Sequence, residues 1–255
     1  MSGSPGAPVE ARRALAASAW SFRWLVELEA EVRFGRLAGR LERAAAGVTL
    51  VELARRASRD ERRHAGLCAE LASEYGQPVD GVPLPPPEVA PAVLEPEQAL
   101  LYEMVAACCV AESGSVAVLT SLLAAARKPR LRAVLHQLAV DEVAHARLGW
   151  AVLATAQRRG ATGFLGPLLP AMLRGSIDDD LFEQVDPTRE DPLLLEAGVL
   201  PHTAKRELFV RTLEEVILPG LDGAGVDTGE GRGWLRRMGT GAPVAGAATW
   251  DGRPS

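Results

Sequence analysis

The feature that most constrains this chain is a five-residue motif, Asp-Glu-x-x-His, which occurs at residues 60–64 and again at 141–145. The chain has only four histidines and two of them end this motif, so a chance match is a weak explanation. In a helix, a glutamate and a histidine three residues apart lie on one face, where they direct an oxygen and a nitrogen to a common point. The motif therefore predicts helices on which carboxylate and imidazole groups converge.

The composition favours a helical protein and argues against several other classes. Aromatic residues make up only 5% of the 255 residues, while alanine, leucine, arginine and glutamate are abundant. The net charge of −5 and the lack of a basic block argue against nucleic-acid binding. The three cysteines lack the spacing of a disulfide framework, and the N-terminus lacks an apolar signal core, so we expect a cytoplasmic protein.

Four long helical patterns are predicted near 11–45, 49–76, 97–127 and 130–159. A proline-rich segment at 78–96 separates the two pairs and cannot itself be helical. Its roughly 20 residues could span about 60 Å when extended. The expected fold is therefore all-α, a four-helix bundle with one long crossover between its second and third helices. Glu103 and Glu112 interrupt the longest apolar stretch, which favours a buried helix over a membrane span.

The chain divides into four expected parts. A flexible N-terminus at 1–10 precedes the bundle at 11–160. A C-terminal helical extension at 161–222 would pack on the bundle, with an extra helix from about Thr203 to Leu218 that stops near Pro219. Residues 223–255 are rich in glycine, alanine, threonine and proline, and we expect a disordered tail there.

Each predicted bundle helix carries a glutamate at the centre of its apolar face, at 100° per residue. These four residues are Glu27, Glu61, Glu112 and Glu142. Uncompensated buried carboxylates cost several kcal/mol each, and two divalent metal ions would balance four of them. Glu31 lies about 40° from Glu27 and is an alternative or additional ligand.

The two motif histidines, His64 and His145, complete a mixed donor set that suits two iron ions, two manganese ions or a mixed pair. The aspartates before the motif glutamates are candidates for holding these imidazoles, since metal-bound histidines usually donate their other N–H to a carboxylate. We expect Asp141 to pair with His64 and Asp60 with His145; the alternative is that each aspartate is simply solvated. The arginines of 55–63 are expected to form a solvated face.

The order E, E-x-x-H, E, E-x-x-H resembles that of the ferritin-like di-iron carboxylate proteins, which include ferritins, rubrerythrins, the ribonucleotide reductase small subunit and bacterial multicomponent monooxygenases. The chain looks closest to bacterial ferritin-like-domain proteins of unassigned activity, over roughly residues 15–222. The resemblance implies that Glu61 and Glu142 bridge the two metals. It also implies that Glu27 and His64 serve one metal, and that Glu112 and His145 serve the other.

The same resemblance implies a non-haem di-iron oxidase, oxygenase or peroxidase that uses O2 or peroxide on a small substrate. No C-x-x-C pair is present, so electrons would come from an external donor. Two alternatives stay open: an iron-handling ferroxidase or storage protein, and a metal-stabilised helical scaffold without catalysis. We expect no nucleic-acid or membrane partner, and a homodimer through helix faces is a reasonable assembly.

Overall fold

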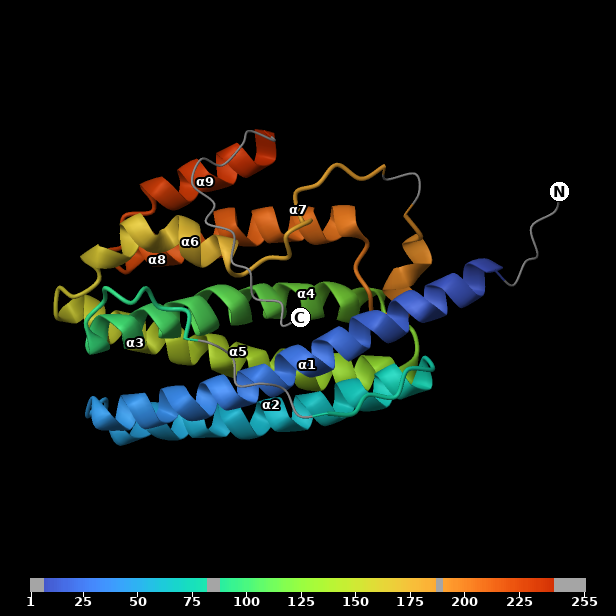
Figure 1. Ribbon diagram of the computed structural model, residues 1–255, viewed down its shortest axis with the longest axis horizontal. Helices are drawn as coiled ribbons and strands as arrows, with labels where there is room; N and C mark the ends of the chain where they lie inside the picture. Colours follow the sequence, from blue (N-terminus) through green and yellow to red (C-terminus); the bar gives the residue numbers. More distant parts are fainter. Residues whose placement is uncertain (1–6, 82–87, 187–189, 241–255) are drawn as a thin grey trace.

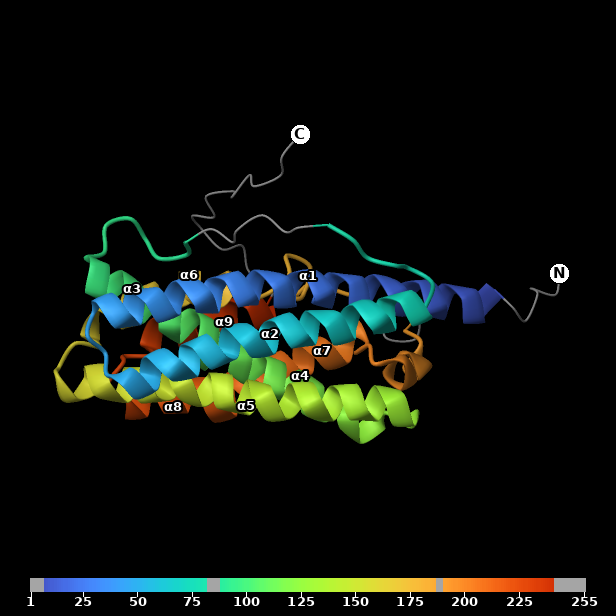
Figure 2. The ribbon, with the colours of Figure 1, turned by 90° about the horizontal axis from the view of Figure 1, so that it is seen from below.

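The computed structural model describes residues 7–81, 88–186 and 190–240, and the regular structure in these ranges is entirely helical. Four long helical stretches run side by side as a bundle (Figure 1), and a view from below shows the same arrangement (Figure 2). They are α1 (Ala7–Arg43), α2 (Val48–Glu74), a third stretch from Pro96 to Ala125, and α5 (Pro129–Arg158). The segment between α2 and the third stretch is the long crossover, so the predicted all-α bundle topology is confirmed.

Local sequence signals explain where two of these helices begin. α3 (Pro96–Met104), the first part of the third stretch, starts with a capping box in which the side chains of Glu95 and Gln98 each bond to the other's backbone. α5 starts with Pro129 in its first turn, where the missing N–H costs nothing. α1 begins at Ala7, so the prediction of a flexible N-terminus was wrong for residues 7–10; residues 1–6 lie outside the described ranges.

The third stretch is not the uniform α-helix that its apolar pattern predicts. Between α3 and α4 (Ser113–Ala125) lies a π-helical segment, η1 (Val105–Glu112). Apolar periodicity predicts which face of a helix is buried, but it does not predict a local change in the backbone hydrogen-bond register. This stretch is the one helix of the described residues long and apolar enough to cross a membrane, and it packs against α5 inside the bundle.

Gly149 allows α5 to approach η1 closely. A Cβ atom at this position would lie 2.4 Å from Cys108 Cβ and 3.0 Å from the Cys109 backbone nitrogen. Both cysteines are fully buried, so neither has room to move aside. The absence of a side chain at residue 149 therefore sets the spacing between the two helices that carry Glu112 and His145.

We expect Gly149→Ala to lower the free energy of unfolding by about 1–3 kcal/mol, because the added methyl group overpacks this interface. The matched control is Gly66→Ala in α2, where a Cβ would meet nothing within 4 Å. That change should be neutral or stabilise the fold by up to about 1 kcal/mol, since alanine has the higher helix propensity. Urea unfolding of both variants measures the difference, and equal midpoints would contradict the close contact.

A C-terminal extension of short helices covers one side of the bundle (Figure 1). Its elements are η2 (Gly163–Leu168), α6 (Leu169–Arg174), η4 (Pro192–Ala197), α7 (His202–Thr212), η5 (Leu213–Ile217), α8 (Leu218–Gly223) and α9 (Gly229–Thr240). Side chains of α6, η5 and α9 share one apolar core with Val105, Cys109 and Leu153 of the bundle. The extension is therefore packed against the helices that carry the predicted site.

Two boundaries predicted in this extension were wrong. The helix predicted to stop near Pro219 continues to Gly223, because Pro219 falls in the first turn of α8, where a missing N–H is tolerated. The predicted disordered tail contains α9, whose Trp234 and Leu235 are buried in the shared core. Its glycine-rich composition concealed this short apolar face; residues 241–255 lie outside the described ranges.

Candidate metal centre

The structure brings the six predicted ligands together in the middle of the bundle. They form two groups of potential metal ligands: Glu27, Glu61, His64 and Glu142 in one, and Glu61, Glu112, Glu142 and His145 in the other. Within each group the ligand atoms lie within 4.8 Å of one another, and all six residues are buried. Glu61 and Glu142 belong to both groups. This overlap is the arrangement expected for two neighbouring ions that share two carboxylates.

Both imidazoles turn the same nitrogen toward the glutamates. Nδ1 of His64 lies 3.2 Å from Glu61 Oε2 and 3.7 Å from Glu27 Oε2. Nδ1 of His145 lies 2.9 Å from Glu61 Oε1 and 3.0 Å from Glu142 Oε2. Nδ1 is therefore the atom of each ring available to a metal at the centre.

The opposite nitrogens face the aspartates of the other motif. Nε2 of His64 lies 3.1 Å from Asp141 Oδ2, and Nε2 of His145 lies 3.5 Å from Asp60 Oδ2. These are the cross-bundle pairs expected from the sequence, and each would fix the orientation of its ring. Their role in metal binding stays a prediction.

Arg63 joins the two aspartates, contrary to the expectation that the arginines of 55–63 form only a solvated face. Its guanidinium lies 2.9 Å from Asp60 and 2.7 Å from Asp141. Sequence reasoning missed this residue because a half-exposed arginine in a charged run has the pattern of a solvated one. Arg63 neutralises part of the charge of the two aspartates and holds them at the outer edge of the imidazoles.

We expect Asp141→Asn to weaken metal binding by about 10–100-fold, the usual effect of removing the carboxylate that holds a ligating histidine. The reason is that Asp141 is the carboxylate in contact with His64 Nε2. Titration against a chromophoric chelator measures the affinity. Asp179→Asn, which changes an exposed aspartate paired with Arg174, is the control and should leave the affinity unchanged.

Burial and mutual repulsion dominate the electrostatics of the glutamates. Burial and the neighbouring Glu142 raise the pKa of Glu61 to about 7. The pKa of Glu112 is raised well above its usual range by burial and then by Glu142 and Glu61. Burial would also raise the pKa of Glu27, but the Arg23 guanidinium and the neighbouring His64 outweigh it and lower that pKa to about 2. The four carboxylates thus cannot all ionise freely without further positive charge.

The pKa values of the two imidazoles are also raised, but here the neighbouring carboxylates raise them while burial opposes the change. Burial opposes the charged form of His64, but Glu27 and Glu61 outweigh it and raise the pKa of His64 to about 11. In the same way Glu142 and Glu61 overcome burial and raise the pKa of His145 to about 10. In the absence of metal, both rings therefore hold a proton that neutralises part of the carboxylate charge.

One oxygen at the centre of the cluster has no hydrogen bond. Glu61 Oε1 is fully buried and, although it lies 2.9 Å from His145 Nδ1, the geometry is wrong for a hydrogen bond. A buried carboxylate oxygen without a partner is costly, and it lies in the residue shared by both ligand groups. The donor set of oxygens and imidazole nitrogens fits iron or manganese. These residues thus fit a dinuclear metal centre.

Glu31, the alternative first-helix ligand, is not part of either group. Its carboxylate pairs with the exposed Arg62, and its backbone oxygen accepts a hydrogen bond of 2.9 Å from Ser58 Oγ. Glu27 instead occupies the buried position, with 3% of its surface exposed. The 40° separation in helical phase is enough to place one glutamate inside the bundle and the other at its edge.

Arg23 is a residue at the centre that sequence reasoning missed. Its Nε donates a hydrogen bond of 2.8 Å to Glu27, and its Nη2 donates one of 2.9 Å to Ser115 Oγ and lies 3.6 Å from Glu142. Ser115 in turn donates a hydrogen bond of 3.2 Å to Glu142. A signal was available, because Arg23 lies four residues before Glu27 and therefore on the same helical face.

A buried glutamate outside this centre is compensated by two arginines. Glu103 of α3 is 1% exposed, but its oxygens lie 3.0 Å from Arg40 and 3.3 Å from Arg36. Two arginines thus compensate one buried glutamate there. At the centre, Arg23 contacts two of the four clustered glutamates, Glu27 and Glu142. The remaining negative charge is what two divalent cations would balance.

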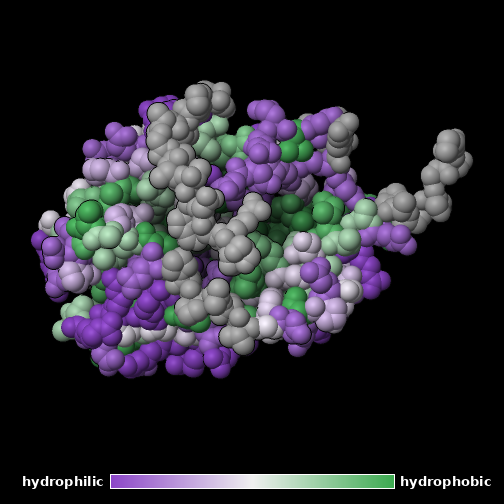
Figure 3. Space-filling model, viewed as in Figure 1, coloured by the Kyte–Doolittle hydropathy of each residue, from purple (hydrophilic) through white to green (hydrophobic). Residues whose placement is uncertain are grey.

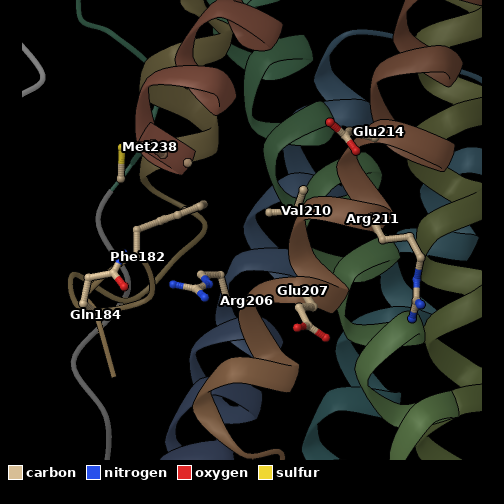
Figure 4. Close-up of a pocket in the computed structure, with 9 residues that line it drawn as sticks. Phe182, Gln184, Arg206, Glu207, Val210, Arg211, Glu214 and Met238 are labelled. Carbon is tan, nitrogen blue, oxygen red and sulfur yellow. The ribbon is translucent and has the colours of Figure 1, made fainter. Parts of the chain in front are cut away.

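Two cavities lie away from these ligands. One, of about 630 Å³, is mostly apolar and is lined by the α1–α2 turn, the start of α3 and the end of α5. The other, of about 400 Å³, lies between α7 and the residues around Phe182 and Met238 (Figure 4). Arg206 and Glu207 line this second cavity, and none of the six ligands borders either one. Both are therefore separate from the candidate metal centre.

No protein-family model matches this chain, and no curated protein matches it in sequence. Among solved structures, it is similar to "Protein 19 with aldehyde deformylating oxidase activity from Synechococcus", with a TM-score of 0.52 and 15% sequence identity. The match covers 87% of this chain and 96% of the other. At this identity the likeness shows the fold, which is a ferritin-like helical one.

Proposed function

We propose that this protein is a di-iron oxidoreductase that uses O2 or peroxide on a small substrate. The observation that carries the proposal is the pair of overlapping ligand groups, which share Glu61 and Glu142 in the core of a ferritin-like bundle. The structural neighbour, a protein described as having aldehyde deformylating oxidase activity, supports oxidative chemistry on this fold. Fold likeness alone does not assign a function, so the weight rests on the site.

The six ligands would be divided between the two ions. Glu27 with His64, and Glu112 with His145, would each serve one ion, while Glu61 and Glu142 would serve both. When bound, two iron ions would supply the electrons for reducing O2 or peroxide. Asp141 and Asp60 would keep Nδ1 of each ring directed at the ions by accepting hydrogen bonds from Nε2.

Apolar side chains limit the access of water to the centre. Phe34 is 1% exposed, and its ring centroid lies 5.3 Å from that of His145. Cys68, one turn beyond His64, is fully buried, and burial with the nearby Glu27 raises the pKa of its thiol, so the thiol stays protonated. Such walls would keep solvent from quenching a reactive centre before it reacts with a substrate.

The direct test is the oxidation of ferrous iron by O2. The protein is loaded with ferrous iron under anaerobic conditions and mixed with O2, and stopped-flow absorbance measures the rate of oxidation. The wild-type protein should bind about two irons per chain and oxidise them rapidly. Glu112→Ala should lose this reaction, because the second ligand group loses a carboxylate that no neighbour replaces. Glu97→Ala, which changes an exposed residue of the same helical stretch, is the control.

The outcome also separates the alternative functions. Full oxidation in Glu112→Ala would count against this site. Rapid oxidation with hundreds of irons retained per assembly would favour iron storage. Two bound metals without any change on exposure to O2 or peroxide would favour a metal-stabilised scaffold.

A further inference from the structure

The cavity of about 400 Å³ in the C-terminal extension contains an arginine whose donors are unused. Arg206 is half-buried in the wall of this cavity, and it makes no ion pair or hydrogen bond with another residue that the structure describes. Figure 4 shows its guanidinium extending from α7 toward Phe182 and Gln184. A guanidinium carries five N–H donors in a planar fork. These donors are therefore available to a ligand in the cavity.

The other charged residues of the cavity limit the charge of such a ligand. Arg211 also lines the cavity, but Figure 4 shows that its side chain extends in a different direction, away from Phe182. Glu207 and Glu214 line the cavity as well, and both are exposed, so solvent and salt screen their charges only in part. An anion with a single charge at Arg206 is therefore favoured over a dianion.

Apolar side chains line the cavity beside this arginine. All are half-buried, and they are Phe182, Val210 and Met238. The Phe182 ring makes edge-to-face contacts with Phe209 and Trp234, with ring centroids 6.1 Å apart in both pairs. These contacts hold the ring in place, and aromatic rings pack favourably against one another. A fork of donors beside an aromatic wall suits a ligand ring that carries a carboxylate.

Contacts between α7 and the segment before it hold the walls of the cavity together. Lys205 of α7 forms an ion pair with Asp178, and His202 Nε2 donates a hydrogen bond of 2.9 Å to the Asp180 carbonyl oxygen. Segment 178–182 is therefore fixed to the helix that carries the arginine. A cavity with fixed walls binds a ligand without the entropic cost of ordering those walls.

The surroundings of the cavity favour a small molecule over a protein partner. Where the C-terminal extension is seen uncovered in Figure 3, its surface is mainly hydrophilic and has only small apolar areas. Protein interfaces are marked by larger exposed apolar patches. The cavity volume is near the lower end of the range for ligand pockets, roughly 300–1,000 Å³, which suits a ligand of about one ring.

We propose that this cavity binds a small aromatic monocarboxylate, whose carboxylate pairs with Arg206 and whose ring packs against Phe182 and Met238. A guanidinium matches a planar carboxylate through two parallel hydrogen bonds. The Gln184 side-chain amide, which also lines the cavity, offers a further donor. The proposal goes beyond the proposed function and does not rest on it, because none of the six metal ligands borders the cavity.

The test titrates the full chain with 4-fluorobenzoate and follows binding by fluorine NMR. The uncharged counterpart, 4-fluorobenzyl alcohol, should bind about tenfold more weakly or worse, because it lacks the charge-assisted hydrogen bonds. Arg206→Gln should weaken the binding of 4-fluorobenzoate by about tenfold or more for the same reason. Arg206→Lys keeps the charge without the planar fork and should fall between Arg206→Gln and the wild type.

The matched control is Arg211→Gln. It removes the same charge from the same helix, but from a side chain that extends away from Phe182. The affinity for 4-fluorobenzoate should change by less than about twofold, because a distant exposed charge is screened by salt. Both variants should unfold at the same urea midpoint as the wild type, since neither arginine has an ion pair or hydrogen bond within the described residues.

Acetate and inorganic phosphate separate the two parts of the site. Acetate has the carboxylate without the ring, so it should displace 4-fluorobenzoate only at much higher concentration. Phosphate should also compete poorly, because Glu207 and Glu214 disfavour a second negative charge. Acetate that competes as well as benzoate would overturn the aromatic part of the proposal.

The remaining outcomes concern the arginine. No saturable binding of 4-fluorobenzoate, or equal affinity for the acid and the alcohol, would overturn the carboxylate site. Unchanged affinity in Arg206→Gln would overturn it too, since the acid would then bind elsewhere, as it would by coordinating a metal. Equal losses in Arg206→Gln and Arg211→Gln would show a general effect of surface charge and would overturn the assignment to Arg206.

Discussion

Glu61→Ala should reduce the metal content from about two ions per chain to nearly none. Glu61 belongs to both ligand groups, and its unbonded Oε1 lies at their junction, so its loss removes a ligand from each ion. Loss of Glu27 should be less severe, because that residue belongs to one group only. Elemental analysis after loading with ferrous iron under anaerobic conditions measures the difference.

The control for this experiment is Glu70→Ala, a change on the same helix, α2. Glu70 is exposed and pairs with Arg130 outside the centre, so two metals should remain bound. Circular dichroism checks that Glu61→Ala is folded. The variant should stay helical, since it removes a buried carboxylate whose pKa is already raised by burial. Two metals in folded Glu61→Ala would contradict a shared-ligand centre.

Metal affinity should fall steeply as the pH is lowered, by at least about a hundredfold per pH unit near pH 7 for two ions together. In the metal-free protein, the pKa values of His64 and His145 are raised to about 11 and about 10, so both imidazoles are protonated. Both protons must leave when the imidazoles bind metal, and each contributes about a factor of ten per pH unit. The raised pKa values of Glu61 and Glu112 act in the same direction.

The sign of this dependence follows from the direction of the shifts. A group whose pKa is raised above the working pH holds its proton in the free protein, so acid favours the metal-free state and base favours the loaded one. Calorimetric titrations in two buffers of different ionisation enthalpy count the protons released. Release of at least two protons per two Mn(II) ions is expected, and release of none would show that the imidazoles are already neutral or do not bind the metal.

Much of the bundle could be predicted because it depends on local periodicity. Apolar residues at helical spacing place the helices, and the prolines of 78–96 exclude a helix between the two pairs. The six ligands are brought together because each glutamate lies at the centre of an apolar face, and faces of that kind meet in a bundle core. Elemental analysis of the wild-type protein and Glu61→Ala tests whether these residues bind metal.

Other features depend on contacts between distant segments. The π-helical segment η1 has an ordinary apolar sequence, and its close approach to Gly149 appears only when α5 packs beside it. The helix α9 is short and glycine-rich, so it is stabilised chiefly by packing on α6 and η2 and by burying Trp234 beside Phe182, rather than by its own propensity. The average composition of residues 223–255 does not reveal that part of this segment packs against other helices.

The helical class, the long crossover and the six buried donors can be predicted from the sequence, because prolines exclude a helix and helical phase fixes which side chains share a face. Packing between the helices selects the residues that accompany these donors. It separated Glu27 from Glu31, paired each aspartate with the opposite histidine, joined the two aspartates through Arg63, and placed Arg23 against Glu27 and Glu142. These choices depend on distances between helices, and no periodicity within a single helix contains that information.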